Sequence, residues 1–551
     1  MPAPTPSNST HHALATADQG DQGADSTRAD HARTLPFSQS LLAMLGIGMV
    51  NLLVALDQTT VSTALPAIVA SLHGFAYYAW IASAYMLTSV IAVPIFGRIG
   101  DYYGRKPFVV AAITTFTIAS VLCAIAPSMG ALIGARALQG IGAGMMTGTA
   151  FASIPDLFPD PKARVRWQVV LATAYGIGTA AGPSLGGFLT DYYGWRSAFL
   201  INLPVGLAAA WCVVRYLPRF APAARGPVQI DFQGAFLLSL LLFCLLVACG
   251  TIHVAEAMHG ATIATVALPF LFGLFYVQEK RASSPIVPLG LFQNRHMVTL
   301  LCLSLLTGAV MFSLIFYVPL TLQAGLGLSA TNAGKLATPF AAFIAVGSLM
   351  NTRIVTRMTR PATILSIGFA LLMLACLGVS RMTAGGAYAL LETSLLLGGI
   401  GLGLILNNLN IFAQETAGRA HVGIATSLMQ STRMIGGLLA VSTIGVWVLR
   451  RYTSRVGVVL DALPGAGGGQ WVRLFDDPQV LVDREKEAAV LHLLAQAPFN
   501  GYQALDSLRQ MFIVVLHLGF YLTAGLAALG VAVTLTIRKI QLHAKGARGT
   551  H

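Results

Sequence analysis

The chain has 551 residues, of which 55% are hydrophobic and only 10% are charged. Soluble globular proteins carry about 25% charged residues, so this composition excludes a water-soluble fold and predicts an all-α protein that crosses a membrane many times. The net charge of +13 does not indicate nucleic-acid binding, because the basic residues are scattered in short segments between apolar runs.

The first segment, residues 1–38, is polar and is expected to be a disordered cytoplasmic tail. Fourteen apolar runs follow, each long enough to span a bilayer at about 20 residues. The first run begins near Gln39 and passes Asp57. The other runs cover residues 79–96, 108–126, 129–151, 167–189, 198–217, 232–249, 261–277, 297–320, 332–351, 362–379, 388–412, 421–449 and 510–537.

The distribution of basic residues predicts the orientation of these spans. If the N-terminal tail is cytoplasmic, the cytoplasmic segments hold 22 Lys and Arg residues, whereas the short external loops hold only Arg196 and Arg381. Cytoplasmic loops of membrane proteins carry such an excess. We therefore predict a multi-pass protein of the cell (inner) membrane with both termini in the cytoplasm.

One long extramembrane segment, residues 450–509, falls on the external side in this topology. Its Gly465–Gly469 stretch predicts a flexible linker, and Asp477-Pro478 predicts the capped start of a helix. The segment is interpreted either as a solvated cap or as a docking surface for a periplasmic adaptor protein.

The first candidate for chemistry is Asp57, in Leu56-Asp-Gln-Thr-Thr-Val-Ser-Thr-Ala-Leu-Pro66. It lies roughly 26 Å along the first predicted helix. A carboxylate inside a span is costly and by default functional, for example as a group that takes up and releases protons. The alternative is an Asp at the outer membrane edge, if the first helix has another register.

Arg136 is the second candidate, in Ala135-Arg-Ala-Leu-Gln-Gly-Ile-Gly-Ala-Gly144. It lies roughly 10 Å into the fourth helix from the external side, a depth close to that of Asp57. A permanently charged guanidinium at this depth needs a partner or a wet cavity. It is interpreted as a group that tunes a carboxylate during proton transfer, or alternatively as part of a structural ion pair.

Two further segments are distinctive. Residues 97–107 form a short charged turn between the second and third spans, with Gly97, Asp101, Gly104, Arg105 and Lys106. In the fifth span, Gly178, Gly182, Pro183, Gly186 and Gly187 indicate a close helix–helix seam with a kink at the proline.

These four motifs resemble those of the major facilitator superfamily, and more narrowly of its fourteen-helix drug:proton antiporters. The resemblance implies proton coupling at Asp57 and Arg136, cytoplasmic gating by the 97–107 turn, and an antiporter seam around Pro183. One position departs from the family pattern, because Ser62 replaces the usual Asn. The resemblance implies no cofactor and no catalytic residue, since a proton gradient drives such transporters.

An internal repeat supports the same architecture. A shift of 255 residues aligns the 97–107 turn with Thr352–Ala362, where Asp101 becomes Thr356 and the glycines are lost. Two six-helix halves follow the repeat logic of these transporters. The predicted parts are the tail (1–38), the N-terminal half (39–217), a linker with two extra transmembrane helices (218–295), the C-terminal half including the external segment (296–537), and a cytoplasmic tail (538–551).

Polar and aromatic residues inside the spans are weaker candidates for a substrate cavity. They are Tyr85, Gln139, Phe316, Gln323, Glu392, Asn407 and Arg433. Glu392 and Lys335 lie at similar depths and are candidates for an ion pair. His253, Glu256 and His259 do not share one helical face, so we predict no metal site.

The sequence therefore predicts a proton-coupled antiporter that exports hydrophobic or amphiphilic small molecules, as in multidrug efflux and antibiotic resistance. One alternative is a proton-coupled transporter of a specific metabolite on the same fold, and the antiporter seam argues against it. A membrane-embedded enzyme is a weaker alternative, because the chain has no phosphate-loop motif and its G-x-S-x-G match, Gly182–Gly186, lies inside the glycine-rich fifth span rather than at a strand-to-helix turn.

Overall fold

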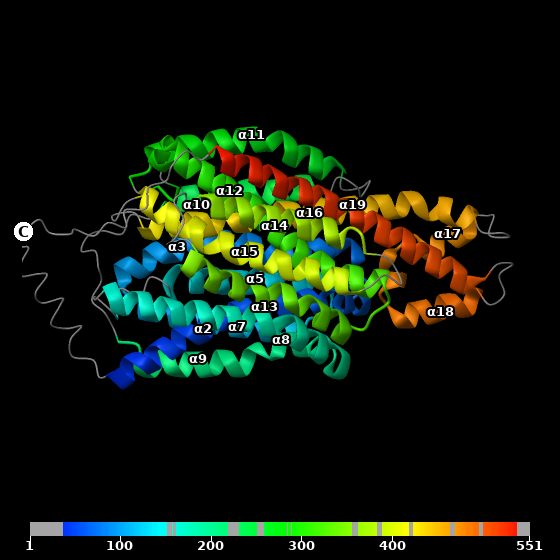
Figure 1. The fold of residues 1–551 in the computed structure, drawn as a ribbon, viewed down its shortest axis with the longest axis horizontal. Coiled ribbons are helices and arrows are strands. Elements are labelled where there is room, and N and C mark those ends of the chain that lie inside the picture. The colour runs from blue at the N-terminus through cyan, green and yellow to red at the C-terminus, as the bar shows by residue number, and fades with distance from the viewer. Residues whose placement is uncertain are drawn as a thin grey trace, which may run out of the picture.

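The computed structural model describes residues 37–150, 157, 161–218, 231–250, 258–283, 285–287, 289–354, 362–382, 388–417, 422–462, 469–494 and 500–536. Helices joined by turns account for nearly all of these residues, and no strand occurs among them (Figure 1). This confirms the predicted all-α class. The predicted tails except residues 37 and 38, which begin the first helix, the Gly465–Gly469 linker except Gly469, and most of the degenerate repeat copy lie outside the described residues.

The N-terminal half of the bundle comprises α2 (Phe37–Ser71), η1 (Phe75–Tyr77), α3 (Tyr78–Tyr103), α4 (Arg105–Ala124), α5 (Met129–Ala150), α7 (Pro161–Tyr193), α8 (Ser197–Leu200) and α9 (Asn202–Tyr216). Two helices follow, α10 (Phe232–Gly250) and α11 (Met258–Arg281). The C-terminal half comprises η4 (Leu289–Gln293), α12 (Arg295–Leu320), the π-helical η5 (Thr321–Gly325), α13 (Ala330–Ile354), α14 (Thr363–Val379), α15 (Tyr388–Ala417), α16 (Val422–Asp461), α17 (Gly469–Phe475), η8 (Pro478–Leu481), α18 (Arg484–Leu494) and α19 (Gly501–Leu535).

Each of the fourteen predicted spans lies on a helix, with the sixth divided between α8 and α9. Ten helical stretches of the described chain are long and apolar enough to cross a membrane, and α10 and α14 are shorter apolar helices. The remaining two of the fourteen predicted spans lie on α5 and α7, which are rich in glycine and contain basic residues.

The two halves meet along three pairs of helices. In these pairs α2 packs on α12, α3 on α16, and α7 on α13. Of the two inserted helices, α10 also contacts both α3 and α16, and α11 packs on α10. The inserted pair therefore covers one seam between the halves and leaves the α7–α13 seam on another side.

The external segment differs from the predicted loop. Helix α16 continues past the predicted end of its span to Asp461, and α19 begins at Gly501, before its predicted span. Tyr452, Val456 and Leu460 recur every four residues and are fully buried, so an apolar stripe extends the helix beyond the membrane-length run. Helices α17 and α18 lie at this end, opposite the first residue of α2 (Figure 1).

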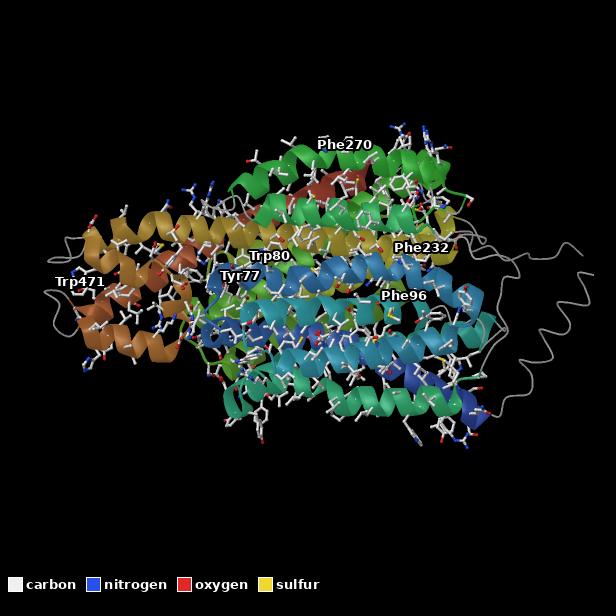
Figure 2. The ribbon with its side chains drawn as sticks, turned by 180° about the vertical axis from the view of Figure 1, so that it is seen from behind. Tyr77, Trp80, Phe96, Phe232, Phe270 and Trp471 are labelled. Atoms are coloured by element: carbon white, nitrogen blue, oxygen red, sulfur yellow. The ribbon has the colours of Figure 1, made fainter. Side chains whose placement is uncertain are left out.

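Large apolar side chains cover the outer surface of the bundle. Phe232 of α10 and Phe270 of α11 point outward in Figure 2, and both are about two-thirds exposed (66% and 68%). An apolar surface this extensive is unstable in water and matches the hydrocarbon of a bilayer. The exposed face of the helices is therefore the lipid-facing surface of a multi-pass membrane protein.

Candidate functional site

Asp57 lies well inside α2, and none of its surface is exposed. Its burial places Asp57 inside the helical bundle and not on its surface. A buried carboxylate is tolerated only when it is paired and hydrogen-bonded. The question is therefore which groups surround its two oxygens.

The charge partner of Asp57 is Arg136 of α5, which is 1% exposed. Arg136 Nη1 donates to Asp57 Oδ2 at 2.8 Å. The same Nη1 donates to Gln139 Oε1 at 2.6 Å, one helical turn further along α5. The two residues that were predicted at similar depths thus form a buried ion pair that links α2 to α5.

The second carboxylate oxygen is bound by two amides. Gln139 Nε2 donates to Asp57 Oδ1 at 2.8 Å, and Asn202 Nδ2 of α9 donates to the same oxygen at 2.9 Å. Both amides also donate to Ser120 Oγ of α4, at 2.8 and 3.3 Å. Asp57, Ser120, Arg136, Gln139 and Asn202 are called the Asp57 cluster below.

Aromatic rings enclose the guanidinium. Arg136 Cζ lies 4.4 Å from the ring centroid of Tyr85 on α3 and 5.9 Å from that of Phe199 on α8. Cys123 of α4 places its thiol 3.7 Å from Gln139 Oε1. Cation–π contacts in a desolvated site contribute about 2 kcal/mol, so this wall stabilises the charged form of Arg136.

Sequence reasoning missed Asn202 and Ser120, and it predicted Gln139 and Tyr85 as cavity-lining residues. In this conformation both are buried: Gln139 belongs to the cluster, and Tyr85 packs its ring against Arg136. The sequence carried only a weak signal for Asn202. Asn202 is an amide at the start of an apolar helix, and such a residue often has only a local structural role.

A cavity of about 20 Å³ lies between the two halves, beside the cluster. Its lining includes Thr59, Ser62 and Pro183 from the N-terminal half and Val318 and Phe340 from the C-terminal half. This volume holds about one water molecule. Ser62, the position that departs from the family pattern, therefore faces the interface between the halves.

The glycines of α7 face two different helices. An added Cβ at Gly182 would lie 1.8 Å from Thr59 Oγ1 of α2, and one at Gly186 would lie 2.5 Å from Thr63 Oγ1. Gly178 is similarly close to the backbone of α2, whereas an added Cβ at Gly187 would lie 2.1 Å from the carbonyl oxygen of Ala330 in α13. The motif around Pro183 is thus a seam through which α7 contacts both halves.

At the end of α7, Asp191 joins the two halves. Its Oδ2 accepts from the backbone nitrogen of Thr331 at 2.7 Å, and its Oδ1 accepts from that of Ala330 at 3.2 Å. These nitrogens are unpaired donors in the first turn of α13, so Asp191 caps a helix of the opposite half. This end of the bundle is the predicted external end.

Sequence reasoning overlooked a signal for Asp191. Asp191-Tyr-Tyr-Gly194 repeats Asp101-Tyr-Tyr-Gly104 at a distance of 90 residues. In both segments Asp-Tyr-Tyr ends a long helix, and the glycine after it has a positive φ, +86° for Gly104 and +79° for Gly194. The N-terminal half therefore carries the same turn at its two opposite ends.

An aromatic chain also closes the predicted external end. Ring centroids are 6.0 Å apart for Tyr317 and Tyr78, 5.9 Å for Tyr78 and Phe75, 6.2 Å for Phe75 and Phe512, and 5.7 Å for Phe512 and Tyr452. These rings alternate between α12, the α2–α3 connection with its flanks, α19 and α16. Because these rings come from both halves, their contacts join the halves at this end of the bundle.

The comparison with known families decides the classification. The profile of the Major Facilitator Superfamily matches residues 47–441. The chain belongs to the major facilitator superfamily. This assignment agrees with the two-half bundle and makes the protein a transporter rather than an enzyme.

Relatives in this superfamily include drug exporters. The chain is 30% identical to the multidrug transporter protein MdtP of Bacillus subtilis over 93% of this chain and 95% of that protein. It is 28% identical to the tetracenomycin C resistance and export protein of Streptomyces glaucescens, over 94% and 95%. Multidrug transport and the export of one antibiotic are thus the named activities of two relatives that match nearly the whole chain.

Solved structures share the fold at low identity. A bacterial homologue of the human lysosomal transporter Spinster, in an inward-facing and occupied conformation, superposes with a TM-score of 0.60 at 14% identity. The match covers 91% of this chain and 97% of that one. The human organic anion transporter MFSD10 superposes with a TM-score of 0.53 at 16% identity, covering 91% and 100%. These matches show the major facilitator fold.

The turn that was predicted to act in gating lies between α3 and α4, where Gly104 takes the positive φ that a tight turn requires. Lys106 Nζ donates to the carbonyl oxygen of Val214 in α9 at 2.8 Å, which ties the turn to the same half. The turn also approaches α5, because an added Cβ at Gly97 would lie 3.5 Å from the carbonyl oxygen of Gly148. Arg105 is half-buried. The side chain of Asp101 lies outside the described part of the chain.

The other candidate cavity residues lie apart from the cluster. Phe316 is buried in α12, and Gln323 Nε2 donates to the carbonyl oxygen of Thr63 at 2.9 Å, so it joins the two halves. Asn407 and Arg433 are half-buried, and Arg433 bonds to Gln430 on its own helix.

Glu392 and Lys335 are both exposed. Within the described part of the chain, the two side chains form no ion pair with each other. The predicted pairing is therefore not observed in this conformation. Each side chain lies on the outward face of its own helix, so similar depth is not enough to bring the two together.

Proposed function

We propose that this protein is a proton-coupled antiporter of the cell (inner) membrane that exports hydrophobic or amphiphilic small molecules. The observation that carries the proposal is the fully buried Asp57–Arg136 pair, held by amides and closed by aromatic rings. A buried carboxylate with a permanent cationic partner has two usable charge states inside a membrane. The drug exporters among its relatives support the substrate class.

The charge of the cluster gives a physical reason for exchange. With Asp57 ionised the pair is neutral, and with Asp57 protonated the guanidinium of Arg136 leaves one net positive charge. Thr59 and Ser62, on the same helix as Asp57, line the cavity between the halves. A unit charge roughly 9 Å from a cationic substrate, at an effective dielectric near 20, changes its affinity by about 2 kcal/mol, or about 20-fold. Proton uptake therefore favours release of a cationic amphiphile.

Alternating access supplies the opening that the present conformation lacks. Drug-sized ligands occupy pockets of about 300–1,000 Å³, whereas the cavity between the halves measures about 20 Å³. The contacts at the predicted external end join the halves through Asp191, Gln323 and Tyr78. We infer that these contacts break when the halves open outward, and that the Asp101 turn closes the cytoplasmic end.

The proposal is tested by a panel of growth-inhibition and dye-efflux measurements in cells that express the protein. We expect raised tolerance to several unrelated lipophilic compounds and rapid ethidium efflux that stops when a protonophore is added while ATP is maintained. Efflux that continues after the proton gradient is dissipated would contradict the coupling. Protection against a single polar metabolite alone would favour the metabolite transporter instead.

Asp191 offers a direct test of the external closure. Asp191→Ala removes the acceptors of the Ala330 and Thr331 nitrogens, whereas Ser329 Oγ still accepts from the nitrogen of Asn332. The loss costs about 1 kcal/mol and shifts the equilibrium toward the outward-open state about fivefold. Asp191→Asn keeps one of the two acceptor oxygens, so its effect should lie between those of the wild type and Asp191→Ala. We measure labelling of a Ser62→Cys reporter in whole cells by a membrane-impermeant maleimide, relative to each parent without the reporter. Faster labelling is expected in Asp191→Ala than in the protein with Asp191, and equal rates in these two would remove Asp191 from the closure.

A further inference from the structure

The Asp57 cluster is built to satisfy a charged carboxylate. Asp57 Oδ2 accepts from Arg136, and Asp57 Oδ1 accepts from Gln139 and Asn202. All three neighbours act as donors in this arrangement. A protonated Asp57 has an O–H group that must itself donate, so the neutral state requires an acceptor that the charged state does not use.

Two amide oxygens lie near the carboxylate, and one of them is already occupied. Gln139 Oε1 accepts from Arg136 Nη1 at 2.6 Å and lies 3.7 Å from the thiol of Cys123. Asn202 Oδ1 is fully buried and has no hydrogen-bond partner. Leaving such an oxygen unpaired costs about 1–3 kcal/mol in this state, which lowers the relative cost of a second state in which the oxygen is paired.

Rotation of the Asn202 amide by half a turn exchanges its oxygen and nitrogen. The oxygen then occupies the position that Nδ2 holds now, 2.9 Å from Asp57 Oδ1 and 3.3 Å from Ser120 Oγ. Ser120 now donates to the carbonyl oxygen of Phe116 at 2.9 Å, and its hydroxyl can turn toward the amide oxygen instead. Both the ionised and the protonated acid thus find a partner in one side chain.

We propose that Asn202 is a positioning residue whose amide orientation follows the protonation state of Asp57. Its Nδ2 donates to the carboxylate, and its Oδ1 accepts from the acid after a proton binds at Oδ1 of Asp57. Arg136 stays bonded to Gln139 and to the other carboxylate oxygen in both states. The inference rests on proton coupling at Asp57, which the proposed function contains.

The other titratable groups near Asp57 are the same in the wild type and in the Asn202 variants. Arg136 of α5, Tyr85 of α3 and Cys123 of α4 interact with its charge, and α8 contributes the uncharged ring of Phe199. Substitution of Asn202 leaves all of them in place. A change in the pH dependence of transport in Asn202 variants therefore reports on the amide itself.

The test compares three variants by the pH dependence of substrate–proton exchange in proteoliposomes. Asn202→Leu keeps the shape and removes the amide from both states. The ionised acid loses a charge-assisted bond that is about twice as strong as the neutral bond lost by the protonated acid, so the half-maximal pH should move upward by about one unit, a tenfold change. Asn202→Asp places a second acid beside Asp57 and should move it upward further. Asn202→Ser retains a group that both donates and accepts, and should restore the wild-type midpoint at a lower rate.

Asn408→Leu is the matched control. Asn408 of α15 is also a fully buried amide with an unpaired Oδ1, but its Nδ2 donates to Asn351 at 2.7 Å rather than to an acid. It should lower thermal stability without moving the pH midpoint. If Asn202→Leu does not fold, the midpoints of the Asp and Ser variants decide.

The outcomes separate the two proposals. A wild-type midpoint in Asn202→Leu or in Asn202→Asp would overturn the role of Asn202. Proton exchange that persists in Asp57→Asn would instead overturn coupling at Asp57. A shift in the Asn408 control equal to that in Asn202→Leu would assign the effect to general loosening of the bundle and also overturn the inference.

Discussion

Asp57→Asn is expected to lower proton-driven efflux by about 100-fold or more, to the background of cells without the protein. A positioned proton-transfer group contributes about 10²–10⁴-fold, and Asn cannot take up the proton. The variant keeps the shape of the side chain, but it fixes the cluster in the charge state that the protonated acid would have. The measurement is ethidium efflux in energised cells at equal amounts of membrane protein.

Asp506→Asn is the matched control for this experiment. Asp506 lies in the first turns of α19, is exposed and bonds to Gln510 on its own helix. The same chemical change there should leave efflux within about twofold of the wild type, because surface substitutions away from special features have small effects. Efflux by Asp57→Asn at the rate of this control would refute the proton site.

Arg136→Met is expected to destabilise the protein more than any surface substitution. It removes the counter-ion of a carboxylate that has no exposed surface, and breaking a buried pair in this way costs about 3–5 kcal/mol. The Asp57→Asn/Arg136→Met double variant should regain most of that stability, because neither charge then remains buried alone. The measurement is the midpoint of thermal unfolding of the purified protein, followed by tryptophan fluorescence.

The control for this prediction is Arg381→Met, at an exposed position after α14. Its unfolding midpoint should match the wild type. If the loss of stability in the double variant equals the sum of the losses in Asp57→Asn and Arg136→Met, the two residues act independently and the ion pair does not determine stability. Efflux should be absent in the double variant in either case, since the proton site is gone.

The fold could be predicted because hydrocarbon imposes one dominant constraint. Backbone groups in a bilayer must bond within a helix, so each long apolar run predicts a helix, and all fourteen runs lie on one. The structure of the predicted external segment, residues 450–509, was harder to predict from the sequence. Arg450, Arg451 and Arg455 end the apolar run, whereas the buried stripe of Tyr452 and Val456 continues the helix on one face only.

The core of the site was predictable for the same energetic reason. Asp57 and Arg136 are charged residues in apolar runs, and such charges are rarely placed there without a partner. Asn202 and Ser120 were not predictable, because an uncharged polar side chain in a helix is commonly satisfied by its own backbone. Thr59, which bonds to the carbonyl oxygen of Ala55, is an example from the same helix as Asp57. Only the assembled bundle shows which polar side chains bind Asp57 and which bond to the backbone of their own helix.

The repeated turn was visible in the sequence but not interpretable from it. Asp101 and Asp191 share the same local sequence, yet the partner of Asp191 comes from α13, 140 residues further along the chain. Such contacts depend on how the two halves meet. Local pattern therefore predicts the turn, and only the assembled bundle identifies it as a contact between halves.

Substrate-induced proton movement in proteoliposomes tests the central claim most directly. The purified protein is reconstituted with a pH-sensitive dye in the lumen, and a lipophilic cation is added outside with no initial pH gradient. The account predicts that inward movement of the cation drives protons out of the lumen, in the wild type and not in Asp57→Asn. Substrate uptake without any change in lumenal pH, or an equal change in Asp57→Asn, would contradict it.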